Sequence, residues 1–314
     1  MKKLHIITLL LLLYGSSAYA QQDMSYSQYV FNTLAINPAY AGYKEALNAH
    51  VFTRLQWMGV DGTPKIYSAI VDGVAAGRNV GWGGQFAMET LGPYSVFSAY
   101  GTYAYRLSLN TREDRLTFGL SAGLSYQQID RNKLQAYDPT SLDYWAYVNN
   151  LTSEARPDFR FGVYYDTPFF YAGLSVTNIF ANFTYAKRIP HMYLTAGGLI
   201  TLSESVSLKP TMLIREDFKG PTNGDVNLFA IFIDRIWVGA GYRTGIPFKG
   251  NLDSIDKLSA TNAVAFITEF YVTPSLRVGY SYDHNLNGWP STHEIGVSYT
   301  VTQRFHRSVT PRFF

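Results

Sequence analysis

Along most of the chain, apolar side chains alternate with small or polar ones at every second position. The pattern is clearest over residues 116–127, where Leu, Phe, Leu, Ala, Leu and Tyr alternate with Thr, Gly, Ser, Gly, Ser and Gln. Successive side chains of a β-strand point to opposite faces, so each such segment has one apolar face and one that can contact water. The pattern predicts an all-β chain, either a soluble sandwich or a transmembrane barrel whose apolar residues face lipid.

The N-terminus favours the barrel because it has the features of a secretory signal peptide. Lys2 and Lys3 precede a short apolar stretch, and Ala-Tyr-Ala at positions 18–20 provides a small-x-small cleavage site. The alternative, an anchoring helix, would need about 20 apolar residues to cross the hydrocarbon. We expect a signal peptide over residues 1–20 and a mature chain that starts at Gln21.

The composition narrows the classes of function. The chain has no cysteine, which excludes disulfides, thiolate metal sites and a lipid-modified N-terminal cysteine. Its formal net charge of +3 falls further when Lys2 and Lys3 leave with the signal peptide, so nothing favours nucleic acid as a partner. The 25 tyrosines and 20 phenylalanines can supply the aromatic belts of a membrane barrel.

Periodicity and turn residues divide the mature chain into about fourteen strands. This number predicts a transmembrane antiparallel up-and-down β-barrel, because an even count brings both ends of the barrel wall to one side of the membrane. The expected strand centres are Val51, Ala69, Gln85, Ala99, Ala122, Gly162, Leu174, Ala196, Thr211, Phe229, Gly239, Phe266, Gly279 and Val297.

The connections between these strands differ in length according to their order. Counted from the N-terminus, the even connections are mostly tight, as at 77–78, 167–168 and 234–235, and the odd ones are mostly longer, as at 131–156 and 245–259. Outer-membrane barrels combine short periplasmic turns with long external loops. We therefore expect both termini in the periplasm and the long loops outside the cell.

Residues 21–42 do not fit a lipid-facing strand, because polar residues fall on both parities and an Asn-Pro break ends the pattern. Irregular backbone cannot face hydrocarbon, so we expect an N-terminal plug or a periplasmic segment. Inward-facing glycines, and a strand around Phe229 that is apolar on both faces, favour the plug. The residues expected in the plug or lumen are Gln28, Tyr29, Phe31, Asn32, Asn37 and Pro38.

The barrel itself is expected over residues 43–303, followed by a basic periplasmic tail over residues 304–314. Pro210 interrupts one strand pattern and could mark a bulge, because proline has no N–H to donate to a β-ladder. The last strand resembles the assembly signal of outer-membrane barrels. Its polar-x-Gly-x-x-aromatic-x-apolar pattern is formed by Glu294, Gly296, Tyr299 and Val301.

Four groups of residues resemble the PorP/SprF family of the type IX secretion system, in the family's order and over almost the whole mature chain. They are Ser27-Gln28-Tyr29-Val30-Phe31-Asn32 with Asn37-Pro38-Ala39-Tyr40-Ala41-Gly42, Gln56-Trp57-Met58-Gly59-Val60-Asp61-Gly62-Thr63-Pro64-Lys65, Leu208-Lys209-Pro210-Thr211 with Trp237-Val238-Gly239-Ala240-Gly241-Tyr242-Arg243, and Gly279-Tyr280-Ser281-Tyr282-Asp283 with Thr292-His293-Glu294-Ile295.

The resemblance implies a non-catalytic outer-membrane protein that helps to secrete, or to retain at the cell surface, a large adhesin-like protein recognised through its C-terminal domain. It implies a link to gliding motility. It also implies other type IX secretion components as partners, a periplasmic peptidoglycan-binding protein among them, together with outer-membrane lipid. The alternative function is an outer-membrane diffusion channel or small-molecule transporter, which would need a continuous polar pore.

Two groups of polar residues at the last hairpin favour a structural role over a chemical one. Asp283, His284, His293 and Glu294 are ligand types that suit zinc, yet His293 and Glu294 are neighbours on a strand and point to opposite faces. Ser291 and His293 share a face, as a nucleophilic serine and its base would in a phospholipase-type barrel. A serine close to a histidine is common by chance in a Ser-rich chain, however, so the pair does not predict catalysis. We expect no catalytic residue, no metal and no cofactor. Two stretches that lack the spaced carboxylates of a calcium loop are interpreted as turns, Asp138-Pro139-Thr140 and Asn223-Gly224-Asp225.

The longest expected loop, residues 131–156, is the strongest candidate for a partner contact. It contains Tyr137, Tyr144, Trp145 and Tyr147 among acidic residues. Tyr and Trp dominate many protein–protein interfaces, so these four are expected to bind the exported protein. The alternative is that they fold back and fill the mouth of the barrel.

Overall fold

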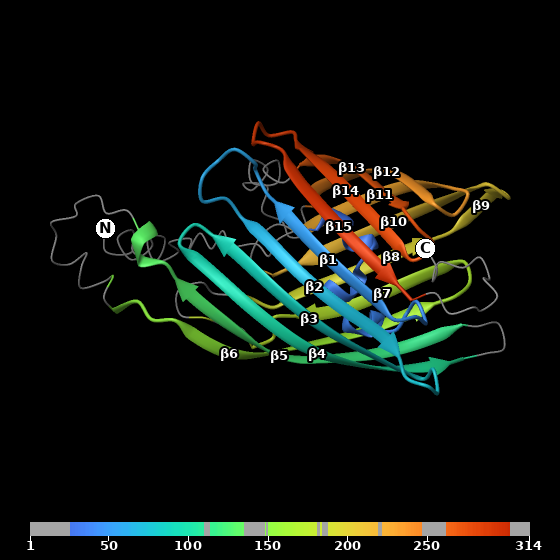
Figure 1. The fold of residues 1–314 in the computed structure, drawn as a ribbon, viewed down its shortest axis with the longest axis horizontal. Helices are drawn as coiled ribbons and strands as arrows, with labels where there is room; N and C mark the ends of the chain where they lie inside the picture. Colours follow the sequence, from blue (N-terminus) through green and yellow to red (C-terminus); the bar gives the residue numbers. More distant parts are fainter. Residues whose placement is uncertain are drawn as a thin grey trace, which may run out of the picture.

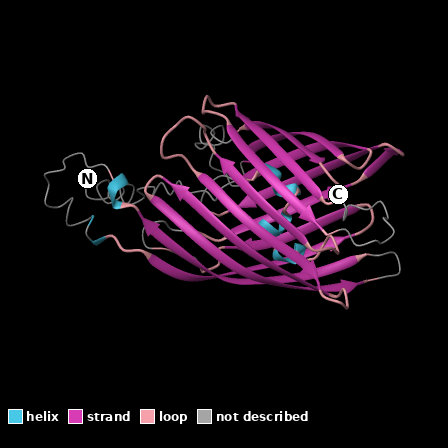
Figure 2. Cartoon of the chain, in the orientation of Figure 1, coloured by secondary structure: helices cyan, strands magenta, loops and turns pink. Residues whose placement is uncertain are grey.

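The computed structural model describes residues 26–109, 114–134, 148, 150–180, 183, 188–218, 222–246 and 262–301. The expected signal peptide and the expected basic tail lie outside these residues. The described part forms one antiparallel sheet that curls into a barrel, with short helices inside it (Figure 1, Figure 2).

The strands of the barrel are β1 (Asn48–Leu55), β2 (Lys65–Val74), β3 (Val80–Leu91), β4 (Tyr94–Ser108), β5 (Arg115–Ile129), β6 (Glu154–Asp166), β7 (Phe170–Thr177), β8 (His191–Gly198), β9 (Ile200–Ser203), β10 (Val206–Glu216), β11 (Thr222–Phe232), β12 (Ile236–Ile246), β13 (Ala263–Tyr271), β14 (Leu276–Asn285) and β15 (Thr292–Thr300). The short 3-10 helices are η1 (Ser27–Val30), η2 (Thr33–Ala35), η3 (Pro38–Tyr40) and η4 (Arg131–Lys133).

The sheet is closed, because its first and last strands pair with each other. β1 pairs antiparallel with β15, from Asn48 opposite Thr300 to Leu55 opposite His293. β8 and β9 both pair with β10 and are two pieces of one interrupted strand, so the barrel has fourteen strands. The predicted barrel is confirmed, and each of the fourteen predicted centres lies within a strand.

The interruption between β8 and β9 lies beside Pro210. β10 pairs with β8 as far as Thr211 opposite Gly197, and with β9 from Leu208 opposite Ile200. Pro210 lies between these two paired stretches, where its missing N–H leaves the ladder one bond short. The register does not shift there, however. The irregularity falls between Val206 and Ser207, nearer the turn that follows β9.

Outward-facing positions are apolar and exposed, whereas most inward-facing positions are polar and buried. Phe86, Leu124 and Val226 are 70%, 62% and 63% exposed. Inward-facing Ser125 and Glu294, by contrast, are fully buried. This is the reverse of a soluble protein and is the pattern expected where the outer surface contacts lipid. No helix in the described part of the chain is both long and apolar enough to span a membrane.

The two ends of the barrel differ in their connections. At one end, here called the turn end, lie the connections 75–79, 109–114, 167–169, 204–205, 233–235 and 272–275. At the other, the loop end, lie 56–64, 92–93, 130–153, 178–190, 217–221, 247–262 and 286–291. The predicted sorting therefore holds, apart from the tight hairpin at 92–93, where Gly92 adopts φ 56°.

Candidate functional site

The N-terminal segment lies inside the barrel and not in its wall. Residues 26–46, here called the plug segment, contain η1, η2 and η3 (Figure 1, dark blue; Figure 2, cyan). The residues expected in the plug or lumen lie here, and all are buried except Asn32, which is half-buried: they are Gln28, Tyr29, Phe31, Asn32, Asn37 and Pro38. The wall begins at Asn48 and ends at Thr300, inside the expected range of 43–303.

The Asn-Pro pair that suggested a break in the sequence begins η3. The Asn37 side chain accepts a hydrogen bond from the N–H of Ala39 at 2.9 Å and caps the helix, while Pro38 occupies its first position. The amide nitrogen of Asn37 donates to the carbonyl of Val163 on β6 at 3.2 Å. One side chain thus both starts a helix and fixes it to the wall.

The plug segment packs an apolar surface against one side of the lumen. The Phe31 ring lies 5.8 Å from that of Phe229 on β11 and 5.5 Å from that of Trp237 on β12, both edge-on. Phe229, Ile231 and Trp237 are at most 1% exposed and point inward. This contact explains why β11 is apolar on both faces, since one face meets lipid and the other meets the plug segment.

Inward-facing glycines allow the plug segment to lie directly on the wall. A methyl group at Gly119 would overlap the backbone of Ala39, one at Gly162 would overlap the Asn37 side chain, and one at Gly81 would overlap the carbonyl of Ala41. Glycine within a strand often marks such a close approach of another backbone. The glycines at inward-facing positions therefore mark the parts of the wall that the plug segment contacts.

A single added methyl group should detect this contact. We expect Gly119→Ala to destabilise the barrel by about 1–3 kcal/mol, the usual cost of overpacking a filled interior. Gly101→Ala is the matched control, because Gly101 lies on the neighbouring strand β4 and a Cβ there meets nothing within 4 Å. Urea unfolding of both variants in lipid vesicles measures the difference. Equal midpoints would mean that the plug segment does not lie on β5.

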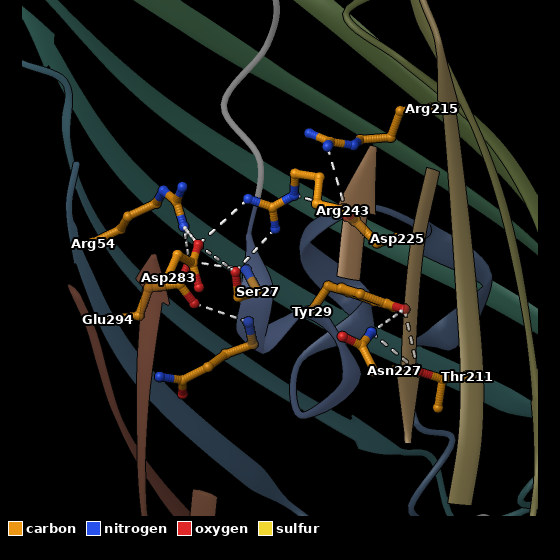
Figure 3. A network of polar contacts seen from close by, with 11 residues as sticks. Ser27, Tyr29, Arg54, Thr211, Arg215, Asp225, Asn227, Arg243, Asp283 and Glu294 are labelled. Carbon is orange, nitrogen blue, oxygen red and sulfur yellow. Dashed lines mark hydrogen bonds and ion pairs between the residues drawn. The ribbon is translucent and has the colours of Figure 1, made fainter. Parts of the chain in front are cut away.

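Near the loop end, charged side chains from six strands surround the start of the plug segment (Figure 3). We call this group the lumen charge cluster. It consists of Arg54 on β1, Arg215 on β10, Asp225 on β11, Arg243 on β12, Asp283 on β14 and Glu294 on β15. Three arginines balance three carboxylates, which is the arrangement that buried charges require.

Glu294 and Asp283 hold the backbone and hydroxyl of η1. The two Glu294 oxygens accept the N–H groups of Ser27 and Gln28 at 2.9 and 2.8 Å. The Ser27 hydroxyl donates to Asp283 at 2.7 Å and accepts from Arg243 at 2.9 Å. The plug segment is thus a member of the charge network and not merely a neighbour of it.

The arginines connect these carboxylates into one network. Arg54 forms ion pairs with both Glu294 and Asp283. Arg243 bridges Asp225 at 2.6 Å and Asp283 at 3.4 Å, and Arg215 lies 3.6 Å from Asp225. Every member is at most 12% exposed, so these pairs are poorly screened by solvent.

Further along, the plug segment is fixed by polar contacts down to the turn end. The Tyr29 hydroxyl accepts from Asn227 at 3.0 Å, and the carbonyl of Ile36 accepts from Ser175 at 2.7 Å. The N–H of Gly42 donates to Asp72 at 2.9 Å. At the turn end itself, Glu45 forms ion pairs with Arg78, Arg106 and Arg115. The segment therefore runs from the loop end to the turn end and enters β1 there.

The polar residues of the last hairpin separate onto two faces. Asp283 and Glu294 point into the lumen charge cluster, whereas the outward His293 shares a 2.7 Å hydrogen bond with the Tyr280 hydroxyl. Ser291 instead contacts the hydroxyl of Tyr282, at 2.7 Å. Among the described residues, no group of three or more His, Cys, Asp or Glu is placed to hold a metal ion.

The expected assembly signal alternates between the two faces of β15. Glu294 and Gly296 face the lumen, while Tyr299 and Val301 are 52% and 41% exposed on the outside. The interpretation of Asn223-Gly224-Asp225 as a turn was wrong. These residues belong to β11, and Asp225 joins the lumen charge cluster because its parity places it on the inward face.

The expected partner-binding residues Tyr137, Tyr144, Trp145 and Tyr147 lie outside the described residues, as does Asp138-Pro139-Thr140. The ends of their loop are fixed, since Arg131 donates to the carbonyl of Leu151 at 2.5 Å. The neighbouring loop also reaches the wall, where Phe183 is buried against Val96 and Arg188 pairs with Glu89 at 2.5 Å.

Several members of the site were missed from the sequence. Arg54 and Arg215 were not singled out, and Arg243 was named only within a stretch that resembles the family. Asp225 was interpreted as part of a turn, and Asp283 was expected to have a structural role at the last hairpin without a named partner. A usable signal was present, because each is a charged residue on the polar parity of its strand. Equal numbers of inward-facing arginines and carboxylates near one end of the barrel indicate that another segment is bound between them.

Comparison with known proteins identifies a family. Residues 18–299 match the family model of the type IX secretion system membrane protein PorP/SprF. A search of curated proteins found no match. Solved structures that resemble this barrel include a deletion mutant of the monoaromatic hydrocarbon channel TodX, with 10% identity, 88% of this chain and 94% of that chain covered, and a TM-score of 0.49.

Two further solved structures are similar in the same way. The outer membrane protein Omp33 of Acinetobacter baumannii is 10% identical, with 82% of this chain and 100% of that chain covered and a TM-score of 0.45. A triple mutant of the Rhodopseudomonas blastica porin is 9% identical, with 82% and 99% covered and a TM-score of 0.36.

Proposed function

The chain belongs to the PorP/SprF family of type IX secretion system membrane proteins, and we propose that it is a non-catalytic outer-membrane barrel that helps to secrete an exported adhesin-like protein or to hold it at the cell surface. The proposal includes export through the signal peptide, with the loop end outside the cell and the turn end in the periplasm. It also includes recognition of the exported protein through its C-terminal domain.

The filled lumen is the observation that carries the choice between an anchor and a channel. A fourteen-stranded barrel is too wide for wall side chains alone to fill, since barrels of about eight strands are filled in this way and those of 16–18 leave an aqueous channel. Here the plug segment occupies the interior and is fixed from Ser27 to Glu45. A diffusion channel would need the polar path that this segment obstructs.

Co-purification tests the proposed function. An affinity-tagged chain, extracted from native membranes in mild detergent, should retain an exported protein that carries a type IX C-terminal domain, together with other components of the system. A tagged barrel of similar size from the same membrane is the control. Recovery of the folded barrel without any exported protein would contradict the proposal.

The long loop supplies a sharper test of where the partner binds. Substitution of Tyr144, Trp145 and Tyr147 by Ala should release the exported protein into the medium, because each aromatic anchor at the centre of an interface contributes about 2 kcal/mol or more. The barrel should remain folded and heat-modifiable on gels. Retention of the partner by the triple variant would place the contact elsewhere, on the turns or on the tail after Gln303.

A further inference from the structure

We propose that the start of the plug segment is a clasp that closes the barrel, joining its first strand to its last two. The seam between β1 and β15 is where the chain's two ends must meet. Of all the strand pairs, it has partners furthest apart in the sequence, and nothing local holds it together. Four inward positions of β1 face four of β15 along this seam.

Three of these four inward pairs are made by wall side chains alone. The Thr300 hydroxyl donates to Asn48 at 2.8 Å, and His50 shares a 2.7 Å hydrogen bond with Ser298. Arg54 forms an ion pair with Glu294, its direct partner in the register. The seam therefore has polar contacts at its two ends and near its middle.

The remaining inward pair is completed by the plug segment. Phe52 faces Gly296, which has no side chain to offer. Gln28 takes that place, because its Oε1 lies 2.8 Å from the position of a Cβ on Gly296 and 2.9 Å from one on Gly279 of β14. Tyr26 packs edge-on against Phe52, with the ring centroids 5.5 Å apart.

The ion pair of the seam also depends on the plug segment. A buried pair stabilises a fold only when hydrogen bonds satisfy the rest of each charged group. The N–H groups of Ser27 and Gln28 supply these bonds to both oxygens of Glu294. The Ser27 hydroxyl extends the contact to Asp283, which Arg54 also binds. Without η1, Glu294 would keep its ion pair with Arg54, and Asp283 its ion pairs with Arg54 and Arg243, but both would lose the hydrogen bonds from Ser27 and Gln28.

Ser27→Pro tests the clasp without changing any wall residue. Proline removes the N–H that Glu294 accepts, and it is tolerated at the first position of a helix. Tyr26 already has φ −104° and ψ 122°, a conformation that a residue before proline favours. Ser27→Ala is the matched control, because it loses the same hydroxyl and keeps the N–H.

The measurement is the fraction of purified chain that refolds into lipid vesicles as a heat-modifiable barrel. We expect Ser27→Pro to lower this fraction at least tenfold relative to Ser27→Ala. Equal fractions for the two variants would overturn the proposal, since the wall alone would then be closing the seam.

A charge swap separates the clasp from a simple ion pair. Arg54→Glu with Glu294→Arg restores opposite charges across the seam but presents a cation to the two N–H groups of η1. The clasp predicts that this double variant stays as defective as Arg54→Glu alone. The control is Glu269→Arg with Arg277→Glu, which swaps an equally buried 2.8 Å pair between β13 and β14. Recovery by the seam swap to the level of the control swap would contradict the clasp.

Discussion

A chain whose residues 29–43 are replaced by a Gly-Ser linker of equal length should conduct ions across a planar bilayer. The replacement keeps Ser27 and Gln28 on the lumen charge cluster, so closure of the barrel is preserved. It removes the apolar side chains that fill the lumen, because flexible Gly-Ser chain has none to pack. Regular conductance steps are therefore expected from this variant, and none from the intact protein.

The same variant should expose a large apolar patch inside the barrel. Phe229, Ile231 and Trp237 lose their cover, and each is at most 1% exposed in the intact protein. Tryptophan fluorescence should shift to longer wavelength as Trp237 meets water. If the linker variant folds but shows neither a fluorescence shift nor conductance steps, the wall must close the lumen without the plug segment.

Truncation of Phe31 should be the most costly single substitution in the plug segment. Phe31 is 5% exposed and lies between Phe229 and Trp237. Phe→Ala changes in filled cores cost about 3–5 kcal/mol, through lost burial and the cavity left behind. Urea unfolding in lipid vesicles, with the slope of the transition compared between variants, measures this loss.

Phe86→Ala is the control for that substitution. Phe86 is 70% exposed on the outward face, where lipid can fill the space that a smaller side chain leaves. Its loss should therefore be clearly smaller than that of Phe31→Ala. Equal losses would indicate that Phe31 contributes only general hydrophobicity and no close packing.

The wall of the barrel was predictable because each strand repeats one simple rule. In β5, for example, residues 116–127 alternate strictly, and a single period identifies the strand and both its faces. The bulge predicted at Pro210 was wrong in position, because β10 runs through this residue without a register shift. The irregularity lies between Val206 and Ser207, where it depends on how β9 meets β10 at the turn.

The contacts of the lumen charge cluster were not predictable, because they join residues far apart in the chain. Arg54 meets residues 229 and 240 positions away, and Ser27 meets Glu294 at a separation of 267. Periodicity indicates that such residues face inward but not which of them meet. The plug segment was recognisable only by its failure to fit a strand, since its 3-10 helices are too short to produce a period.

We expect the plug segment to close the lumen permanently, so that the barrel holds a protein and does not conduct. The chain has no native cysteine, which allows a single disulfide to be introduced without competing thiols. Asn37→Cys with Gly162→Cys is suited to this, because Cγ of Asn37 lies 3.0 Å from the position of a Cβ on Gly162. The bridge would fix η3 to β6.

Single-channel recording from the intact protein and from this variant, oxidised and reduced, is the most direct test of a closed lumen. We expect no conductance steps from any of the three, because the plug segment already occupies the lumen without the disulfide. Regular steps from the intact protein would contradict it. Conductance steps that the reduced variant shows and the oxidised variant lacks would indicate a plug segment that leaves the lumen. Steps that persist in the oxidised variant would indicate an open pore.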